Sequence, residues 1–270
     1  MTDSFGRIIN YLRLSVTDRC NLRCVYCMPA EGIPLLHHSD ILTYDQIEDF
    51  TRYAVTRGIT RVRLTGGEPL VRKGICTLIS RLAAIKGIED LSMTTNGQLL
   101  GAMAKDLREA GLHRLNISLD TLQPERYTRL SRRGDLQPVL DGIQAARVAG
   151  FGKKGSPIKL NCVLLPDTTE QEKNALKTFA RSNDMELRFI HCMDLAAGTF
   201  SRVEGGDGGN CTRCNRLRLT ATGILKPCLF NELGYDIRRL GAEKAMDLAL
   251  LNKPPKGMHN TRDSFYTLGG

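Results

Sequence analysis

Residues 10–28 read NYLRLSVTDRCNLRCVYCM, and this stretch decides the fold. Its first half, 10–16, alternates in the manner of a β-strand. Its second half carries Cys20, Cys24 and Cys27, spaced C-x3-C-x2-C. A closed zinc site takes four protein ligands, and a cubane iron–sulfur cluster normally takes four cysteines. Three thiolates in one tight loop therefore indicate a cluster whose fourth iron is left open for a small molecule.

Outward from this stretch, strand-like and helix-like segments alternate. Thr43 and Gln46 form a capping box ahead of a helix that Gly58 ends. Further strands are predicted at 61–65, 90–94, 114–119, 158–165 and 185–191. Further helices are predicted at 74–85, 98–110, 138–149 and 169–182. Six strand-then-helix units imply an α/β fold with a parallel sheet, which we interpret as a partial, six-stranded β/α barrel.

Polar loops follow several of these strands at the carboxyl end. Gly66-Gly67-Glu68-Pro69 follows the second strand, TTNG at 94–97 ends the third, SLD at 118–120 ends the fourth, and Met193 follows the sixth. Because sites in parallel sheets lie at the carboxyl ends of the strands, these loops are expected to meet the cysteine loop at one opening.

A second trio, Cys211, Cys214 and Cys228, is spaced C-x2-C-x13-C. Arg216 and Arg218 follow closely, and alternate residues of a strand share a face, so both guanidinium groups can point at one anionic ligand. Zinc remains an alternative at both trios, with a histidine as the fourth ligand. The candidate histidines are His37 and His38 for the first trio and His259 for the second. A flexible, linker-like GGDGG run precedes the second trio, and a weakly patterned basic tail follows it.

The composition narrows the class of protein. Lys and Arg number 38 against 29 Asp and Glu, a net charge of +9 that suits an anionic small molecule such as a nucleotide. No nucleic-acid motif accompanies the charge, and no apolar run is long enough to cross a membrane. The N-terminus lacks the pattern of a secretory signal. Nine cysteines then indicate a reducing, cytoplasmic location. Of these, Cys76, Cys162 and Cys192 lie outside the trios and are expected to be buried.

Several motifs together resemble one enzyme family. The cysteine loop with Tyr26, and GGEP after the second strand, resemble the signatures of the radical S-adenosylmethionine superfamily. RLSVTDRCNLRCVYCMP, TGGEPLVR, TTNG, NISLD, RFI-x-x-MD, CNRLRLTATGILKPCLF and the terminal GG resemble the GTP 3′,8-cyclase family. The resemblance implies a lyase that cyclises GTP to (8S)-3′,8-cyclo-7,8-dihydroguanosine 5′-triphosphate at the start of molybdenum cofactor biosynthesis. Its implied cofactors are two [4Fe-4S] clusters and S-adenosylmethionine.

The resemblance also implies roles for individual residues. No side chain acts as a classical catalyst, because the radical comes from the cofactor, and Arg13, Gly269 and Gly270 support it. The implied ligands of the first cluster are Cys20, Cys24 and Cys27, and those of the second are Cys211, Cys214 and Cys228. The implied S-adenosylmethionine contacts are Tyr26, Gly67, Ser118 and Met193. The implied GTP contacts are Arg13, Arg63, Thr94, Lys159, Arg216, Leu217 and Arg218.

The chain departs from the family pattern at one place. The family has further strands and a helix between the sixth strand and the second trio, whereas here Phe200 passes almost directly into GGDGG. We therefore expect a barrel over 1–200 and a shortened iron–sulfur module with a Gly-Gly tail over 201–270. Two other functions stay open: a radical enzyme with an auxiliary cluster that acts on a peptide, and an inactive relative that only binds clusters. The expected partners are GTP and an electron donor protein, with a homodimer possible and no nucleic acid or membrane.

Overall fold

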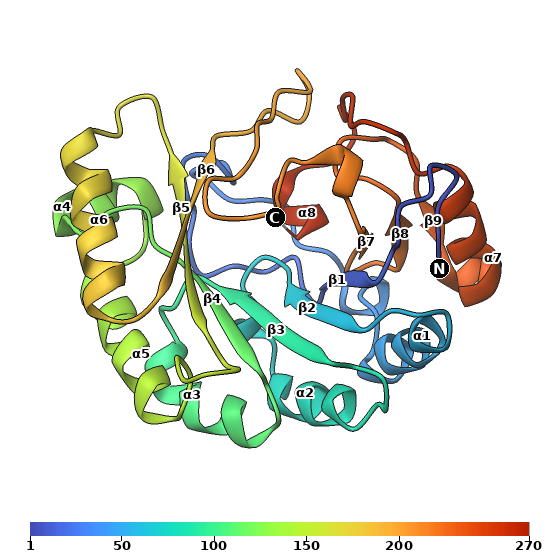
Figure 1. Cartoon of the computed structure of the whole chain (residues 1–270), viewed down its shortest axis with the longest axis horizontal. Helices are drawn as coiled ribbons and strands as arrows, with labels where there is room; N and C mark the ends of the chain where they lie inside the picture. The colour runs from blue at the N-terminus through green and yellow to red at the C-terminus, as the bar shows by residue number, and fades with distance from the viewer. Residues whose placement is uncertain (270) are drawn as a thin grey trace.

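The computed structural model describes residues 1–269, and Figure 1 shows a curved sheet with helices along its outer side. Six strands stand in the order β6-β5-β4-β3-β2-β1, and every neighbouring pair is parallel. They are β1 (Tyr11–Ser15), β2 (Arg61–Thr65), β3 (Asp90–Thr95), β4 (Arg114–Ser118), β5 (Ile158–Leu164) and β6 (Glu186–His191). The predicted partial β/α barrel is confirmed, with strand ends within a residue or two of those expected.

Two of the helices between these strands begin at capping boxes. Thr43 and Thr169 accept hydrogen bonds from the third helical N–H and complete capping boxes with Gln46 and Glu172. The helices are α1 (Tyr44–Thr56), α2 (Ile75–Ala83), α3 (Leu100–Glu109), α4 (Pro124–Ser131), α5 (Leu136–Val148) and α6 (Glu170–Ser182). Among these six helices, only α4 was not predicted from the sequence. The signal for its start is a proline at the first helical position.

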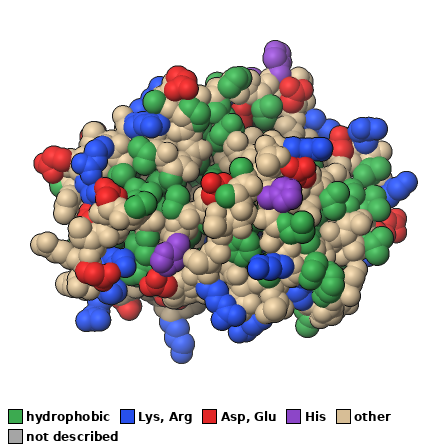
Figure 2. Space-filling model, turned by 90° about the horizontal axis from the view of Figure 1, so that it is seen from above, with side chains coloured by type: hydrophobic (Ala, Val, Ile, Leu, Met, Phe, Trp, Pro, Cys, Tyr) green, Lys and Arg blue, Asp and Glu red, His purple; other side chains and the backbone are tan. Residues whose placement is uncertain are grey.

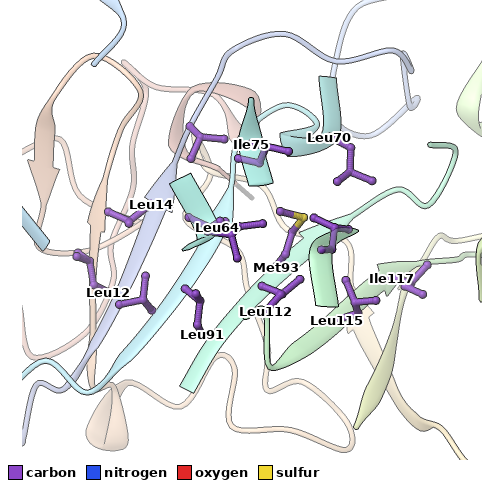
Figure 3. Packing of buried hydrophobic residues seen from close by; sticks show 14 of the residues in the cluster. Leu12, Leu14, Leu64, Leu70, Ile75, Leu91, Met93, Leu112, Leu115 and Ile117 are labelled. Carbon is purple, nitrogen blue, oxygen red and sulfur yellow. The ribbon is translucent and has the colours of Figure 1, made fainter. Parts of the chain in front are cut away.

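The strands separate an apolar side from a polar side. Leu12, Leu64, Met93 and Leu115 belong to the buried core between sheet and helices, which Figure 3 shows. On each strand, the residues next to these apolar ones point to the concave side of the sheet, because side chains alternate along a strand. Arg13 therefore faces inward, into the curve.

The C-terminal part extends the same sheet. It contributes β7 (Arg216–Leu219), β8 (Ile224–Lys226) and β9 (Tyr235–Asp236), then α7 (Ile237–Leu251) and α8 (Phe265–Leu268). β7 pairs with β1 in parallel, whereas β8 and β9 continue antiparallel. The predicted weakly patterned tail is wrong, because it contains a 15-residue helix. Non-helical Gly241 interrupts that helix and breaks the periodicity that would have revealed it. Figure 1 shows α8 inside the curve of the sheet.

The glycine run is a compact turn rather than an extended linker. Glu204 pairs antiparallel with Phe189 of β6, and the Val203 N–H donates to the carbonyl of Gly208 at 2.9 Å. Gly205 and Gly209 both adopt φ of 75°, and a β-carbon on Gly209 would lie 2.0 Å from the Ser201 carbonyl oxygen. Glycine is therefore required by the geometry of this turn, a reason that composition alone does not reveal.

Within residues 1–269, no helix is long and apolar enough to cross a membrane. Lys and Arg side chains are interspersed with acidic and apolar ones on the face shown in Figure 2.

Candidate functional site

A cavity of about 690 Å³ occupies the concave side of the sheet, and both cysteine trios lie on its wall. Cys20, Cys24 and Cys27 come from the loop after β1. Cys211 and Cys214 flank a short turn before β7, and Cys228 follows β8. The parallel pairing of β7 with β1 thus brings together two trios that are almost two hundred residues apart in the chain.

The first cysteine loop is held by backbone hydrogen bonds. The N–H groups of Cys27 and Met28 donate to the carbonyl of Cys24 at 2.9 and 3.0 Å, which coils the loop into a turn. Gly67 N–H donates to the Thr17 carbonyl, and Glu68 N–H to that of Arg19, both at 2.8 Å. The GGEP loop is therefore fastened along the start of the cysteine loop.

The four residues implied for S-adenosylmethionine all lie on the cavity wall: Tyr26, Gly67, Ser118 and Met193. The Tyr26 hydroxyl donates to Asp120 at 2.6 Å, and Asp120 also accepts from the Val163 N–H at 2.8 Å. Burial, together with the charge of Asp120, raises the pKa of Tyr26 well above its ordinary value. Tyr26 is thus a neutral phenol that fastens the cysteine loop to the end of β4.

Glu68 is a site residue that the sequence reasoning missed. Its side chain is 1% exposed and accepts from Thr95 Oγ1 and the Asn96 N–H, both at 2.7 Å, and from the Leu70 N–H at 3.0 Å. Burial raises its pKa to about 7. Glu68 ties the loop after β2 to the loop after β3. The GGEP motif contains this residue and is the sequence signal that could have found it.

Cations form a row across the concave side. β1 pairs Arg13 with Arg63 of β2 and with Arg218 of β7, so the three share one face in register. Burial, then the charge of Arg218, lowers the pKa of Arg13, and burial followed by Arg216 lowers that of Arg218 to about 10. Such crowding of like charges favours an anionic ligand, which would relieve the repulsion.

The remaining residues implied for GTP divide into two groups. Thr94, Lys159 and Arg216 line the cavity, and Lys159 forms an ion pair with Glu186. Leu217 does not line it, because its side chain is fully buried in the main core on the other face of β7. Because side chains alternate along a strand, Leu217 points to the opposite face from its neighbours Arg216 and Arg218.

Further wall residues escaped the sequence analysis. The Tyr11 ring lies 5.4 Å from the Arg63 guanidinium carbon and 5.7 Å from that of Arg216, so it contacts two cations of the wall. Arg188 of β6 also lines the cavity, and burial lowers its pKa. Tyr11 belongs to the predicted strand 10–16 and Arg188 to the predicted strand 185–191, and strand alternation alone places both on the inner face.

The C-terminal tail enters the cavity. Leu268 is 1% exposed and packs in a small cluster with Leu195, Leu229 and Phe230. Gly269 adopts φ of 70°, and a β-carbon there would lie 2.3 Å from Thr65 Oγ1, so only glycine fits. The predicted role of Gly270 falls outside the described residues.

Zinc fits this wall less well than a cluster does. His37, His38 and His259 are exposed and are not among the residues of the cavity wall, so the zinc alternatives lack their proposed fourth ligands. Over 1–269, no three His, Cys, Asp or Glu side chains form a group that could hold a metal ion.

The cysteines outside the trios are placed differently from one another. Cys162 is fully buried in the core, as predicted, and Cys76 is half-buried against it. Cys192 is exposed, so the expectation that it is buried is wrong. It follows the last residue of β6, where the chain leaves the sheet, and it lies on the cavity wall.

Comparison with known proteins identifies the family. Residues 14–179 match the model of the Radical SAM superfamily. GTP 3′,8-cyclases from Moorella thermoacetica and Geobacter sulfurreducens are each 43% identical to this chain, over 88% of it and 86% of their own length.

Solved structures agree in fold. Streptococcus suis SuiB bound to its precursor peptide SuiA superposes with a TM-score of 0.68, at 17% identity, over 93% of this chain and 66% of that one. The enzyme anSMEcpe with bound AdoMet gives 0.62, at 16% identity, over 96% and 87%. Identities this low support the fold alone. The extended match to the cyclases is decisive, and this chain belongs to the GTP 3′,8-cyclase family of the radical S-adenosylmethionine superfamily.

Proposed function

We propose that this chain is a radical S-adenosylmethionine lyase that converts GTP to (8S)-3′,8-cyclo-7,8-dihydroguanosine 5′-triphosphate in molybdenum cofactor biosynthesis. The observation that carries the proposal is that both cysteine trios and a row of arginines line one cavity. The family membership supports the same reaction.

The two trios would hold the cofactors. Cys20, Cys24 and Cys27 would bind a [4Fe-4S] cluster, with Tyr26, Gly67, Ser118 and Met193 around S-adenosylmethionine. When bound, these groups supply a 5′-deoxyadenosyl radical. The protein holds the cofactor in a fixed place: Tyr26 is anchored on Asp120, and Glu68 joins the neighbouring loops.

Cys211, Cys214 and Cys228 would bind the second cluster, next to the substrate. Arg13, Arg63, Thr94, Lys159, Arg216 and Arg218 would contact GTP with their side chains, whereas Leu217, which the resemblance also implies, does not line the cavity. Charge-assisted bonds from guanidinium groups to phosphate are strong and directional. Gly269 and Gly270 would bring the tail against the substrate, since Arg218 already donates to the Gly269 carbonyl at 3.5 Å.

The shortened segment before Cys211 is compatible with this assignment. β7 is in register with β1 from Tyr11 to Leu14, and the glycine turn packs on β6. Both ends of the shortened segment are thus anchored to the sheet, which favours an assembled substrate site over an inactive relative. A product assay on the reconstituted protein separates these two readings.

The peptide alternative has less support. The solved structure with a bound precursor peptide shares only the fold with this chain, whereas the row of arginines on the concave side suits a triphosphate. A GTP-dependent rise in thermal stability would favour the nucleotide, because a ligand of the native state stabilises it. We further propose the division into 1–200 and 201–270, a cytoplasmic location, an electron donor protein as partner and a possible homodimer.

Arg218→Ala tests the substrate site. Removal of this buried charge should weaken GTP binding by about 2 kcal/mol or more, roughly 30-fold. Binding of S-adenosylmethionine should be nearly unchanged. Anaerobic titrations of the reconstituted parent and variant measure both ligands, with Arg238→Ala, on the exposed start of α7, as the matched control. Equal GTP affinities of parent and Arg218→Ala would reject the assembled site.

Cys24→Ala tests the radical chemistry separately. The variant should form no 5′-deoxyadenosine under dithionite, and the parent should carry two four-iron clusters after anaerobic reconstitution. Stoichiometric zinc without iron in the parent, or undiminished cleavage in the variant, contradicts the proposal.

A further inference from the structure

Lys253 is a buried lysine that the proposed function does not use. Lys253 lies just beyond the end of α7 and is 2% exposed. It lines the cavity beside the second trio. A buried ammonium is costly unless its charge and its three N–H donors are satisfied. Its partners therefore indicate what it serves.

Both hydrogen-bond acceptors of the ammonium lie next to cysteines of the second trio. Nζ donates at 2.7 Å to the carbonyl of Arg216, two residues after Cys214, and to the carbonyl of Pro227, which directly precedes Cys228. Lys253 therefore bridges the two chain segments that carry Cys214 and Cys228.

A second cation holds this arrangement in place. Arg7 donates to the Cys211 carbonyl at 2.8 Å and to the Pro254 carbonyl, next to Lys253, at 2.7 Å. Its own position is fixed by a buried ion pair with Asp3. The N-terminal segment thus ties Cys211 to the end of α7, so the position of Lys253 is set from both sides.

The two trios have different charged surroundings. Two carboxyl groups lie beside the first trio: Asp120, which accepts from Tyr26, and the buried Glu68. One cation, Arg23, donates to the Cys20 carbonyl at 2.8 Å. Beside the second trio, Lys253 lines the cavity wall together with the two arginines of β7. The charge around the second trio is therefore the more positive.

We propose that Lys253 is an outer-sphere cation of the second iron–sulfur centre, a positioning residue that makes this centre easier to reduce than the first. The proposal rests on the proposed function, since it needs a cluster on Cys211, Cys214 and Cys228. Reduction adds one electron and no proton to the cluster. A fixed positive charge stabilises the more negative, reduced form, and net charge and hydrogen bonds to sulfur are known determinants of cluster potentials.

The test is an anaerobic redox titration with dithionite, followed by electron paramagnetic resonance, on the reconstituted full chain. Lys253→Met removes the charge at similar length, Lys253→Gln keeps an amide donor, and Lys253→Arg keeps the charge. The triple variant C20A/C24A/C27A assigns the signal of the second centre. Each sample is also analysed for iron, so that absence of the second cluster from the parent, a failure of the proposed function, is distinguished from an unchanged potential.

In the parent, the second centre should be reduced before the first. In Lys253→Met and Lys253→Gln, the ratio of reduced to oxidised second centre at a fixed potential should fall at least tenfold, which is 59 mV for a one-electron couple. Lys253→Arg should stay near the parent, and the first centre should not shift. Loss of the second cluster from both neutral variants but not from Lys253→Arg would mean that Lys253 is needed for cluster binding, which overturns the redox role. A parent potential in either neutral variant, or loss of the cluster from all three, overturns it.

Discussion

At Gly67, the loop after β2 passes so close to the cysteine loop that a β-carbon would lie 2.2 Å from the Arg19 carbonyl oxygen. Gly67→Ala should therefore push the loops apart and break the two backbone bonds that join them. Iron bound after anaerobic reconstitution should fall by about one cluster. Gly101→Ala is the control, because its β-carbon would meet nothing nearer than 3.9 Å within α3. Full iron content in Gly67→Ala would contradict the tight fit.

Glu68 predicts a pH dependence of stability. Burial raises its pKa from 4.5 to about 7 in the folded chain. The folded state therefore binds this proton more tightly than the unfolded state, and the stabilisation is complete below pH 4.5 and is lost as pH rises through 7. The free energy of unfolding should fall by up to about 3 kcal/mol over this range.

Urea unfolding of the metal-free protein at pH 5 and pH 7.5 measures this fall. Glu68→Gln cannot titrate at this position and should show a smaller fall, while every other group titrates equally in both proteins. The same fall in parent and variant would show that the carboxyl group is already ionised at pH 5.

At the scale of elements, α7 depends on its N-terminal cap. The Asp236 carboxylate accepts from the N–H groups of Arg238 and Arg239 at 2.8 and 3.3 Å. Asp236→Ala should destabilise the chain by roughly 0.5–2 kcal/mol in urea unfolding. Lys244→Ala, on the exposed side of the same helix, should change stability by about 0.5 kcal/mol or less. Equal losses in the two variants would mean that the cap is not what stabilises α7.

The elements also show what could be predicted from the sequence. Strands β1 to β6 could be predicted because each buries one apolar face, and α1 and α6 because capping boxes mark their starts. α7 could not, because Gly241 splits its pattern. Positions on the site wall followed from alternation and the family resemblance. The contacts of Glu68 and Lys253 depend on chain segments far apart in sequence, and no local pattern encodes them.

For the whole molecule, the arrangement of the sheet decides how the parts cooperate. β1 lies between β2 and β7, so the N-terminal strand joins the barrel to the C-terminal extension. Arg7, which donates to the Cys211 carbonyl, and the tail at Gly269, which lies against Thr65 and Ser15, add contacts across the same junction. Separation of 201–270 from the rest would expose both β1 and β7 along their shared edge, with unpaired backbone groups. We therefore expect the proposed division into 1–200 and 201–270 to mark two functions within one folding unit.

Two single-tryptophan variants test this cooperativity, since the chain contains no tryptophan of its own. Tyr53→Trp reports on α1 in the barrel, and Tyr235→Trp reports on β9 in the C-terminal extension. In urea, both fluorescence transitions should coincide with each other and with the loss of circular dichroism, because one sheet unfolds as a unit. The circular dichroism midpoint of each variant, compared with the parent, controls for the substitution itself. An earlier transition for Tyr235→Trp alone would mean that the extension opens while the barrel stays folded, and that the second trio leaves the cavity before the first.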